Sequence, residues 1–473
     1  MNFVIFVNGV ALLFSAALML LDALIFPDTA RIFAESALFT GFPGILLAIC
    51  ASATFTGLQR LHGFLLTSSI WVTAALAGAV PLWMAGLTPV DALFESMSGI
   101  TTTGATVMSG LDQTPHGVLL WRAILQAVGG VGFIVTGIAL LPVLRVGGMQ
   151  LFQTESSDRS EKEIGSAASF AAATLAVYLG LMLLCGVFYE AGGMGIFDAT
   201  THAMTTLSTG GYSNYDASFG HFDSAYLQWV GTGFMLAGGL PFAWYIRGWR
   251  KRSFGNEQVA AMLKTLSVVI VVLAAWLIVT RSLPVAEAFR LVAFNVVSVV
   301  TTTGYATTDY TVWGPVAQVA FLGLTIVGGC TGSTSGGAKA LRWLIFARSL
   351  KRAVRHVHAP HSVGQIRYEG RAVAPDVLNG VMAFFVFYAV TASVIAIVLA
   401  FLGMELDAAV SGALTALANV GPGLGEVIGP AGNFAPLGAA EKLVLVLGMY
   451  LGRLELLTVY VLLMPAFWRE VRG

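Results

Sequence analysis

The chain has 473 residues, of which 57% are hydrophobic and 11% are charged, and its formal net charge is zero. An ordinary soluble domain has roughly 25% charged residues, and a single soluble core stops growing near ~300 residues, so this composition excludes a soluble globular protein. The cysteines Cys50, Cys185 and Cys330 lie far apart in apolar segments, so they predict neither a disulfide framework nor a zinc site.

Apolar segments long enough to cross a bilayer, which takes about 20 residues, recur along the whole chain. The first lacks a basic leader and an obvious cleavage site, so we interpret it as a retained transmembrane helix and not as a signal peptide. In chain order the predicted spans are 3–26, 37–56, 64–87, 117–144, 166–190, 226–246, 260–281, 315–350, 378–402 and 441–467. They predict an all-α integral membrane protein with ten transmembrane helices.

Four short polar runs recur about every 100 residues, which indicates internal repetition. The runs are Thr101–Gly104, Leu207–Gly210, Thr301–Gly304 and Ala418–Gly421. They follow short predicted helices at 90–101, 197–207, 286–300 and 407–418, and each run lies between two predicted spans. The sequence therefore predicts four pseudo-symmetric repeats of helix, pore loop and helix after an N-terminal helical hairpin.

The predicted divisions follow from this repetition. They are the two-helix hairpin at 1–60, pore repeats at 61–145, 146–250 and 251–350, a basic cytoplasmic linker at 351–374, and a fourth pore repeat at 375–473. The third repeat has a broken second helix.

A cation that enters the bilayer loses its water, so oxygen ligands must replace it, and backbone carbonyls in a loop can do so. Glycine allows such a loop to turn at low steric cost, although any one run alone is equally explained as an ordinary turn. The candidate cation ligands are Thr102, Thr103, Gly104, Ser208, Thr209, Gly210, Thr302, Thr303, Gly304, Asn419, Val420 and Gly421. The four runs differ, so we expect a filter that is only pseudo-symmetric and that rejects sodium incompletely.

Charges near the short helices support a cation path. The C-terminal end of each short helix carries roughly half a negative charge from its macrodipole, which favours a cation. Asp91, Asp198, Glu287 and Asp407 lie near the helix starts, and we interpret them as capping and mouth charges, not as ligands.

The eighth predicted span contains a glycine-rich stretch at 328–337 that does not suit a continuous helix. Irregular backbone at membrane depth is tolerated only where it lines water or is buried in protein. We therefore predict a gate just inside the filter, with a closely packed kinked helix as the alternative. The candidate gate residues are Gly328, Gly329, Gly332, Ser333, Thr334, Gly336, Gly337, Lys339 and Arg453.

Arg453 belongs to this set because it lies in the last predicted span. A charge at the bilayer centre costs about 2.5–3.5 kcal/mol, so it needs partners, and carbonyls of the broken eighth helix are candidates. A structural ion pair or an interface position is the alternative. Lys339 either hydrogen-bonds the loop or faces the cytoplasm, and Arg122 and Glu455 are expected to have packing roles.

The basic residues predict the orientation. All but six of the 25 lysines and arginines fall on one side when both termini are cytoplasmic, which places the four pore loops outside. The exceptions are Arg31, Arg122, Arg281, Arg290, Lys442 and Arg453. The basic stretches 247–252 and 348–371 either dock an acidic partner or lipid headgroups, or reflect only this bias. We expect His356, His358 and His361 to be solvated and not to bind a metal.

The sequence shows no nucleotide-binding glycine fingerprint, catalytic triad or paired carboxylates in a pocket, so an enzymatic role is not expected. Any regulation by nucleotides would have to come from another chain.

Three segments and the four hairpins together resemble the Trk/Ktr superfamily of potassium transporters. The segments are Val327–Lys339, Asn419–Gly425 and Gln153–Lys162. The extra N-terminal hairpin resembles the ten-helix TrkH/TrkG type more than the eight-helix KtrB type. One departure is Pro241, which stands where the family usually has an asparagine.

The resemblance implies potassium uptake across a bacterial inner membrane through a channel-like pore, with Arg453 lining the path below the filter. It also implies a homodimer in membrane lipid, each protomer with its own pore, gated by a cytosolic nucleotide-binding subunit of the TrkA type. No cofactor or nucleic acid is expected; potassium at the filter is the only metal and is the substrate. The alternative is a secondary symporter coupled to protons or sodium, for which Glu455 is the one candidate acidic residue. The parallel repeat argues against an organic-solute carrier, because such carriers are usually built from inverted repeats.

Overall fold

The computed structural model describes residues 2–52, 60–140, 167–361 and 364–472. The cytoplasmic loop predicted at 145–165, including the Gln153–Lys162 segment, lies outside these ranges.

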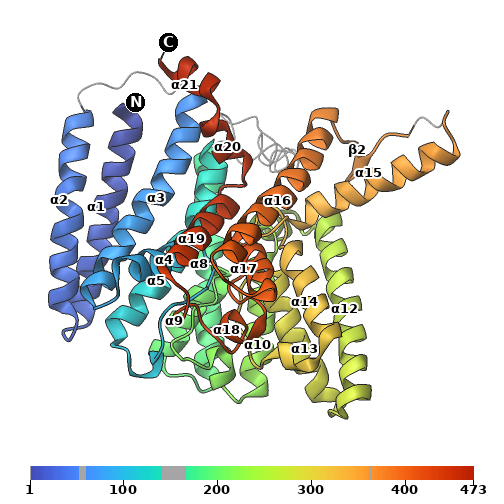
Figure 1. Cartoon of the computed structure of the whole chain (residues 1–473), viewed down its shortest axis with the longest axis horizontal. Coiled ribbons are helices and arrows are strands. Elements are labelled where there is room, and N and C mark those ends of the chain that lie inside the picture. Colours follow the sequence, from blue (N-terminus) through green and yellow to red (C-terminus); the bar gives the residue numbers. More distant parts are fainter. Residues whose placement is uncertain (1, 53–59, 141–166, 362–363, 473) are drawn as a thin grey trace.

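Two long helices, α1 (Asn2–Ile25) and α2 (Ala30–Ser52), form the N-terminal hairpin, which stands at one edge of the molecule (Figure 1). Glycines permit their close approach, since a Cβ atom built on Gly9 would lie 2.9 Å from the carbonyl oxygen of Gly44. The hairpin packs against α3 and α5 and stays outside the four repeats.

Each repeat consists of a long helix, a short helix, an irregular loop and a closing helix. The long helices are α3 (Arg60–Met84), α8 (Ala167–Ala191), α12 (Glu257–Arg281) and α16 (Pro375–Phe401). The short helices are α4 (Pro89–Ile100), α9 (Ile196–Leu207), α13 (Val285–Val300) and α17 (Leu406–Ala418). The closing helices are α5 (His116–Leu140), α10 (Ala225–Gly239) with α11 (Phe242–Lys251), α14 (Pro315–Val327) with α15 (Ala340–His358), and α19 (Ala439–Arg453) with α20 (Leu457–Leu463).

Minor elements complete the chain. They are η1 (Leu111–Gln113), η2 (Ser218–His221), η3 (Tyr310–Trp313), α18 (Gly425–Ile428), α21 (Pro465–Arg472), and the antiparallel strands β1 (Arg367–Tyr368) and β2 (Arg371–Ala372).

The repeats close on themselves. The closing helix of each repeat packs against the short helix of the next: α5 against α9, α10 against α13, and α14 against α17. In the fourth repeat, α19 packs against α4 of the first. This cyclic packing gathers the four short helices at the centre of the molecule and brings the ends that carry the polar runs together.

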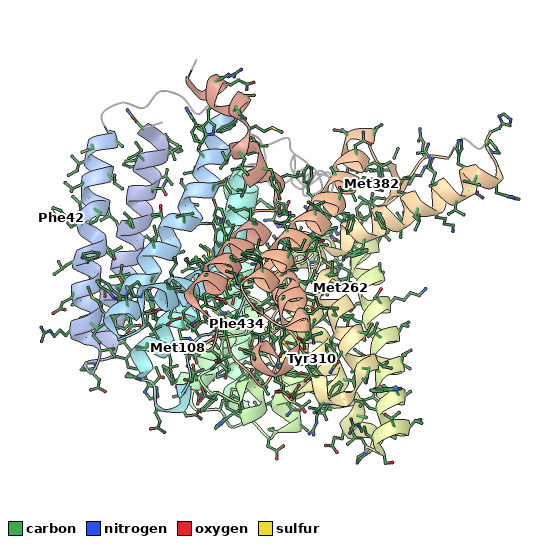
Figure 2. All side chains as sticks on the ribbon, in the orientation of Figure 1. Phe42, Met108, Met262, Tyr310, Met382 and Phe434 are labelled. Carbon is green, nitrogen blue, oxygen red and sulfur yellow. The ribbon has the colours of Figure 1, made fainter. Side chains whose placement is uncertain are left out.

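The exterior is largely apolar. Phe42 on α2 is 66% exposed and points away from the bundle, whereas Met262 and Tyr310 are buried (Figure 2). In the described part of the chain, six helices are long and apolar enough to cross a membrane, namely α1, α2, α3, α8, α12 and α16. The bent pair α19–α20 would make a seventh.

Two spans predicted as continuous are broken. The span at 226–246 breaks at Pro241, which has no N–H to donate to Ala237; the Tyr245 hydroxyl donates to the Ala237 carbonyl instead, at 2.8 Å. The span at 441–467 bends by 110° between α19 and α20, where Glu455 and Leu456 have φ of 59° and 53°. The eighth span is interrupted as predicted, by residues 328–339 between α14 and α15.

Other helix boundaries also differ from those predicted from the sequence. Helix α2 begins at Ala30 and not at 37, and α15 continues to His358, past the predicted repeat boundary at 350. The predicted linker 351–374 therefore begins as helix, and the β1–β2 hairpin follows.

Candidate functional site

The four short helices end in the same backbone conformation. Left-handed φ angles of 53–58°, which strain any residue other than glycine, occur at Thr102, Thr209, Thr302 and Asn419. Each of these residues donates its N–H to a carbonyl three residues earlier, for example Thr302 to Val299 at 3.1 Å. The chain thus leaves all four helices by one common turn.

A glycine with positive φ follows two residues after each of these turns. These glycines are Gly104 (86°), Gly211 (73°), Gly304 (79°) and Gly421 (106°). Our sequence register for the second repeat, which put Gly210 in this position, was therefore wrong by one residue. The N–H of Gly210 donates to the carbonyl five residues earlier, Thr205, as those of Thr103 and Thr303 do to Ser98 and Ser298.

The loops meet in a closed ring, which we call the loop ring and define as residues 102–104, 209–211, 302–304 and 419–421. A Cβ atom built on each glycine would collide with a carbonyl oxygen of another loop. The distances are 2.2 Å from Gly104 to Gly210, 1.7 Å from Gly211 to Thr303, 2.0 Å from Gly304 to Val420, and 2.8 Å from Gly421 to Thr103. The loops therefore approach one another too closely for any residue but glycine at these four positions.

The loop ring concentrates buried carbonyl oxygens. Within the described ranges, only one of its twelve carbonyls accepts a hydrogen bond, that of Gly210. Buried carbonyls are normally paired, so a group of unpaired oxygens at four helix C-terminal ends suits a cation that has lost its water. Ser208 does not belong to this group. It is equivalent to Thr101 and Thr301 at the helix end, and its carbonyl accepts the Thr209 hydroxyl at 2.7 Å.

Side-chain hydroxyls support two of the loops from within. The hydroxyls of Thr101 and Thr103 lie 2.8 Å apart, and those of Thr301 and Thr303 lie 2.9 Å apart. Asn419 joins the fourth loop to the first, since its Nδ2 donates to Thr103 Oγ1 at 3.0 Å.

A buried ion pair that the sequence did not reveal ties the first two loops together. Arg122 Nε lies 2.8 Å from Glu95 Oε1, and Arg122 also donates to the Ser213 carbonyl at 2.9 Å. Glu95 accepts the N–H of Val107 at 2.9 Å, and Tyr212 donates its hydroxyl to the Glu95 carbonyl at 2.7 Å. Arg122 therefore holds the outer parts of two repeats, a more specific role than the packing we expected.

The four acidic residues near the helix starts lie in the first turns of α4, α9, α13 and α17. Asp91 pairs with Lys442 of the fourth repeat at 2.6 Å. Asp198 accepts the hydroxyl of Tyr215 at 2.8 Å. Burial, and then this hydrogen bond, raise the pKa of Tyr215 to about 12, so Tyr215 remains a donor at neutral pH.

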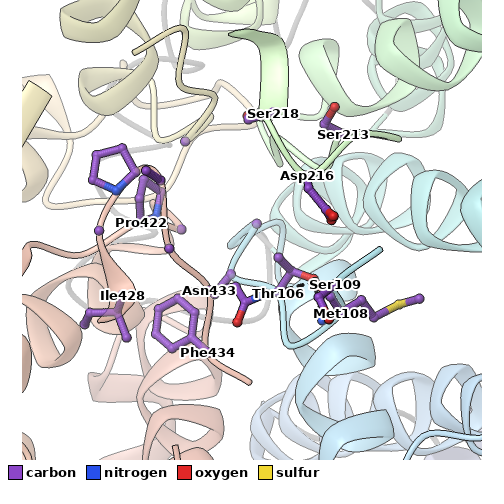
Figure 3. Close-up of a pocket in the computed structure, with 18 of the residues that line it drawn as sticks. Thr106, Met108, Ser109, Ser213, Asp216, Ser218, Pro422, Ile428, Asn433 and Phe434 are labelled. Carbon is purple, nitrogen blue, oxygen red and sulfur yellow. Dashed lines mark hydrogen bonds between the residues drawn. The ribbon is translucent and has the colours of Figure 1, made fainter. Parts of the chain in front are cut away.

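A cavity of about 490 Å³ opens on one side of the loop ring, which we call the outer side because the basic residues predict that it faces outward (Figure 3). Thr106, Asp216 and Pro422, from three different repeats, line it (Figure 3). All four positive-φ glycines of the ring line it as well. The loops of separate repeats therefore share this one cavity.

The glycine-rich segment, residues 328–339, lies against the loop ring on the side away from this cavity. Gly336 donates its N–H to Thr302 Oγ1 at 2.7 Å, and the Thr334 hydroxyl contacts the Leu207 carbonyl at 3.0 Å. Cys330 donates to the Gly239 carbonyl at 2.9 Å, beside the break at Pro241. Positive φ angles at Gly328, Gly332 and Gly337 let the segment fold into this position.

The predicted gate residues are brought together here. Arg453 donates to the Thr334 carbonyl and to the Gly129 carbonyl, each at 3.0 Å. The buried Lys339 ammonium donates to the Ser335 carbonyl. Arg453 thus contacts the glycine-rich segment as expected, and Gly129 of α5 is a partner that the sequence did not suggest.

A small void lies beside the glycine-rich segment. Ser335, Gly336, Lys339 and Arg453 border it, and its volume of about 10 Å³ gives room for about one water molecule. The glycine-rich segment therefore packs closely around Arg453 among the described residues.

A second contact joins the two broken helices. Arg342 of α15 pairs with Glu455 at 2.7 Å, and its guanidinium lies 4.0 Å from the Phe384 ring centroid. Glu455 lies in the bend between α19 and α20, so this pair fixes the bend beside Arg453. Neither the bend nor this partner of Glu455 was apparent in the sequence.

Metal-ligating residues do not cluster in the described part of the chain, where no group of three or more His, Cys, Asp or Glu residues could hold a metal ion. His356 and His358 lie on the exposed end of α15.

The sequence matches the family model of TrkH, described as a cation transport protein, over residues 29–268 and 257–469. It is 48% identical over 413 residues to the Trk system potassium uptake protein TrkI of Halomonas elongata, covering 86% of this chain and 84% of that protein. It is 30% identical over 465 residues to the Trk system potassium uptake protein TrkG of Escherichia coli, covering 93% and 94%. The structure is similar to the crystal structure of the potassium transporter TrkH from Vibrio parahaemolyticus, with a TM-score of 0.89, 31% identity and 99% coverage of both chains.

Proposed function

This chain belongs to the TrkH family of cation transport proteins, and we propose that it takes up potassium through the loop ring as an ion-selective filter. The chain is a multi-pass membrane protein, and its relatives are potassium uptake proteins and not enzymes. The observation that carries the proposal is the closed ring of carbonyls at four helix C-terminal ends, of which only that of Gly210 accepts a hydrogen bond within the described ranges.

We assign the ion contacts to the loop ring. The proposed ligands are the carbonyls of Thr102, Thr103, Gly104, Thr209, Gly210, Gly211, Thr302, Thr303, Gly304, Asn419, Val420 and Gly421. Compared with the ligands predicted from the sequence, this set includes Gly211 and leaves out Ser208, because the second loop is shifted by one residue. The glycines are needed because a carbonyl of another loop occupies the space of any side chain at these positions.

We assign the gate to the glycine-rich segment and Arg453. The segment obstructs the inner side of the ring, and the positive charge of Arg453 opposes a cation there. Uptake then requires the segment to leave its contacts with Thr302, Leu207 and Arg453.

The direct test is rubidium uptake by purified protein in liposomes loaded with potassium. Uptake that potassium inhibits far better than sodium supports the proposal, and uptake that both ions inhibit equally contradicts it. The reversal potential, measured under a pH gradient and separately under a sodium gradient, tests the alternative of coupled transport. We expect no shift, since the one acidic candidate, Glu455, is engaged in an ion pair with Arg342.

We also propose that the chain acts in a bacterial inner membrane as a homodimer, with a cytosolic nucleotide-binding subunit as its gating partner. Its relatives are named as parts of a Trk system, which supports the presence of further components. Calorimetry of the purified chain with ATP and with NADH checks the partner assignment. Micromolar binding by this chain alone would contradict it.

A further inference from the structure

The four loops of the ring are not supported in the same way. In the first and third loops, a threonine hydroxyl at the middle position pairs with the hydroxyl two residues earlier, as in Thr301 and Thr303. The second loop has Gly210 at this middle position, so it has no side chain to make such a bond.

Gln126 of α5 occupies the space that Gly210 leaves. It is fully buried, and its Nε2 donates to the Gly210 carbonyl at 2.7 Å. Its Oε1 accepts the N–H of Tyr212 at 3.0 Å. A Cβ atom built on Gly210 would lie 2.4 Å from Gln126 Cδ and 2.5 Å from its Oε1.

We propose that Gln126 is a positioning residue that determines ion selectivity, by holding the second loop in place of the threonine that this loop lacks. The inference deepens the proposed function and rests on the loop ring being the filter. Gln126 does not face the ion in this proposal. It acts through the Gly210 carbonyl and the Tyr212 amide.

The chemistry of the carboxamide suits this role. A carbonyl oxygen has two lone pairs, so Gly210 can accept the Gln126 N–H and still direct an electron pair toward an ion. One side chain fixes two backbone groups on either side of Gly211, the glycine that turns the loop. A loop without this support can shift to fit a smaller ion, because selectivity among monovalent cations depends on how closely the carbonyls are held.

The experiment compares permeability ratios from bi-ionic reversal potentials in liposomes. Gln126→Leu keeps the volume and removes both hydrogen bonds, and we expect the potassium-to-sodium ratio to fall about tenfold, the equivalent of ~1.4 kcal/mol. Gln126→Met also keeps the volume and removes both hydrogen bonds, so its ratio should fall by a similar factor. This second variant decides the question if Gln126→Leu does not fold.

A rescue separates selectivity from general packing. Gln126→Ala together with Gly210→Thr gives the second loop a hydroxyl at the middle position, within reach of Ser208, as in the first and third loops. The backbone at Gly210 is not left-handed, and the three atoms nearest to a Cβ built there all belong to Gln126, so shortening Gln126 removes these contacts. We expect this double variant to recover most of the ratio that Gln126→Ala alone loses.

The matched control is Gln228→Leu, which changes a buried glutamine of α10 that donates to the Phe222 carbonyl away from the ring. An unchanged ratio in the Gln126 variants would overturn the inference, as would an equal loss in Gln228→Leu. Gly304→Ser is measured beside them. If it leaves the ratio unchanged, the filter assignment itself fails, whereas a loss confined to Gly304→Ser rejects only the role of Gln126.

Discussion

At the scale of single residues, strain and burial concentrate in the loop ring. Three threonines and one asparagine hold left-handed backbone angles, at about 1–2 kcal/mol each. Such strain persists only where the surroundings determine it, and here the tight contacts between loops do so. The same contacts make the adjacent glycines the positions least tolerant of a side chain.

Serine at Gly304 or Gly211 should therefore lower the potassium-to-sodium permeability ratio about tenfold, the equivalent of ~1.4 kcal/mol. The new Cβ would lie 2.0 Å and 1.7 Å from carbonyls of the neighbouring loops, which must move. Gly104→Ser should act in the same way. Bi-ionic reversal potentials measure the ratio.

Gly110→Ser is the matched control, since Gly110 has a φ of 71° but no atom within 4 Å of a built Cβ. Backbone strain alone would lower the ratio in all of these variants to the same extent, and that result would count against the ring.

The buried Glu95–Arg122 ion pair is a second place where a single residue is expected to affect stability. Arg122→Ala leaves the Glu95 carboxylate buried without its cation, so we expect the free energy of unfolding to fall by about 3–5 kcal/mol. Denaturant unfolding in detergent measures this loss. The exposed pair Arg31–Glu35 is the control, and Arg31→Ala should change little. Equal effects of the two substitutions would show that burial of the pair is unimportant.

At the scale of elements, three breaks in the closing helices act together. Pro241 ends α10, and the Gly238 and Gly239 carbonyls at that end accept the Thr334 hydroxyl and the Cys330 N–H. The glycine-rich segment separates α14 from α15, and the bend at Glu455 separates α19 from α20. Arg453 and the Arg342–Glu455 pair connect the second and third breaks, so movement of α15 would act on the segment beneath the ring.

Arg453→Ala should raise rubidium flux about tenfold and leave ion selectivity nearly unchanged. Hydrogen bonds from a charged group contribute roughly 1.5–3 kcal/mol, enough to shift the closed fraction by that factor or more. Arg453→Lys, which keeps the charge and loses the planar fork, should give an intermediate flux. Lower flux in folded protein, or lost selectivity at the parental flux, would show that Arg453 supports the ring and does not close it.

At the scale of the whole molecule, cyclic packing of four repeats brings four loops of one polypeptide into one ring. The outer cavity and the glycine-rich segment lie on opposite sides of this ring, so the two ends of the proposed path differ. The distribution of basic residues predicts that the cavity faces outward, because the cytoplasmic loops of membrane proteins carry an excess of lysine and arginine.

Cysteine labelling tests this orientation. In a Cys50→Ser background, Ser109→Cys beside the outer cavity should react with a membrane-impermeant maleimide in intact cells, and Ser253→Cys between α11 and α12 should react only in inverted vesicles. Cys185 and Cys330 are buried and serve as the internal background. The opposite labelling pattern would reverse the predicted orientation.

The sequence by itself determined the features that depend on local chemistry. Hydropathy indicated a membrane protein of helices, the recurrence of polar runs indicated four repeats, and the glycines at 328–337 indicated the interrupted eighth span. It also placed Arg453 near that interruption. These features can be predicted from the sequence because a segment that crosses a bilayer must be a long apolar helix, and because glycine and proline disfavour a continuous helix.

Only the tertiary structure decided which groups meet. Gly210 and Gly211 are adjacent, so the sequence alone does not show which of them turns the loop. The close approach of Gly211 to the Thr303 carbonyl of the next repeat identifies it as Gly211. The two residues with left-handed φ at the bend are Glu455 and Leu456, neither of which is a glycine, and Arg342 holds Glu455 from 113 residues away. Gln126, one of few polar residues in a largely apolar helix, gains its role only because cyclic packing places it beside Gly210, which has no side chain. Such roles arise from contacts between distant segments, and local sequence patterns do not encode them.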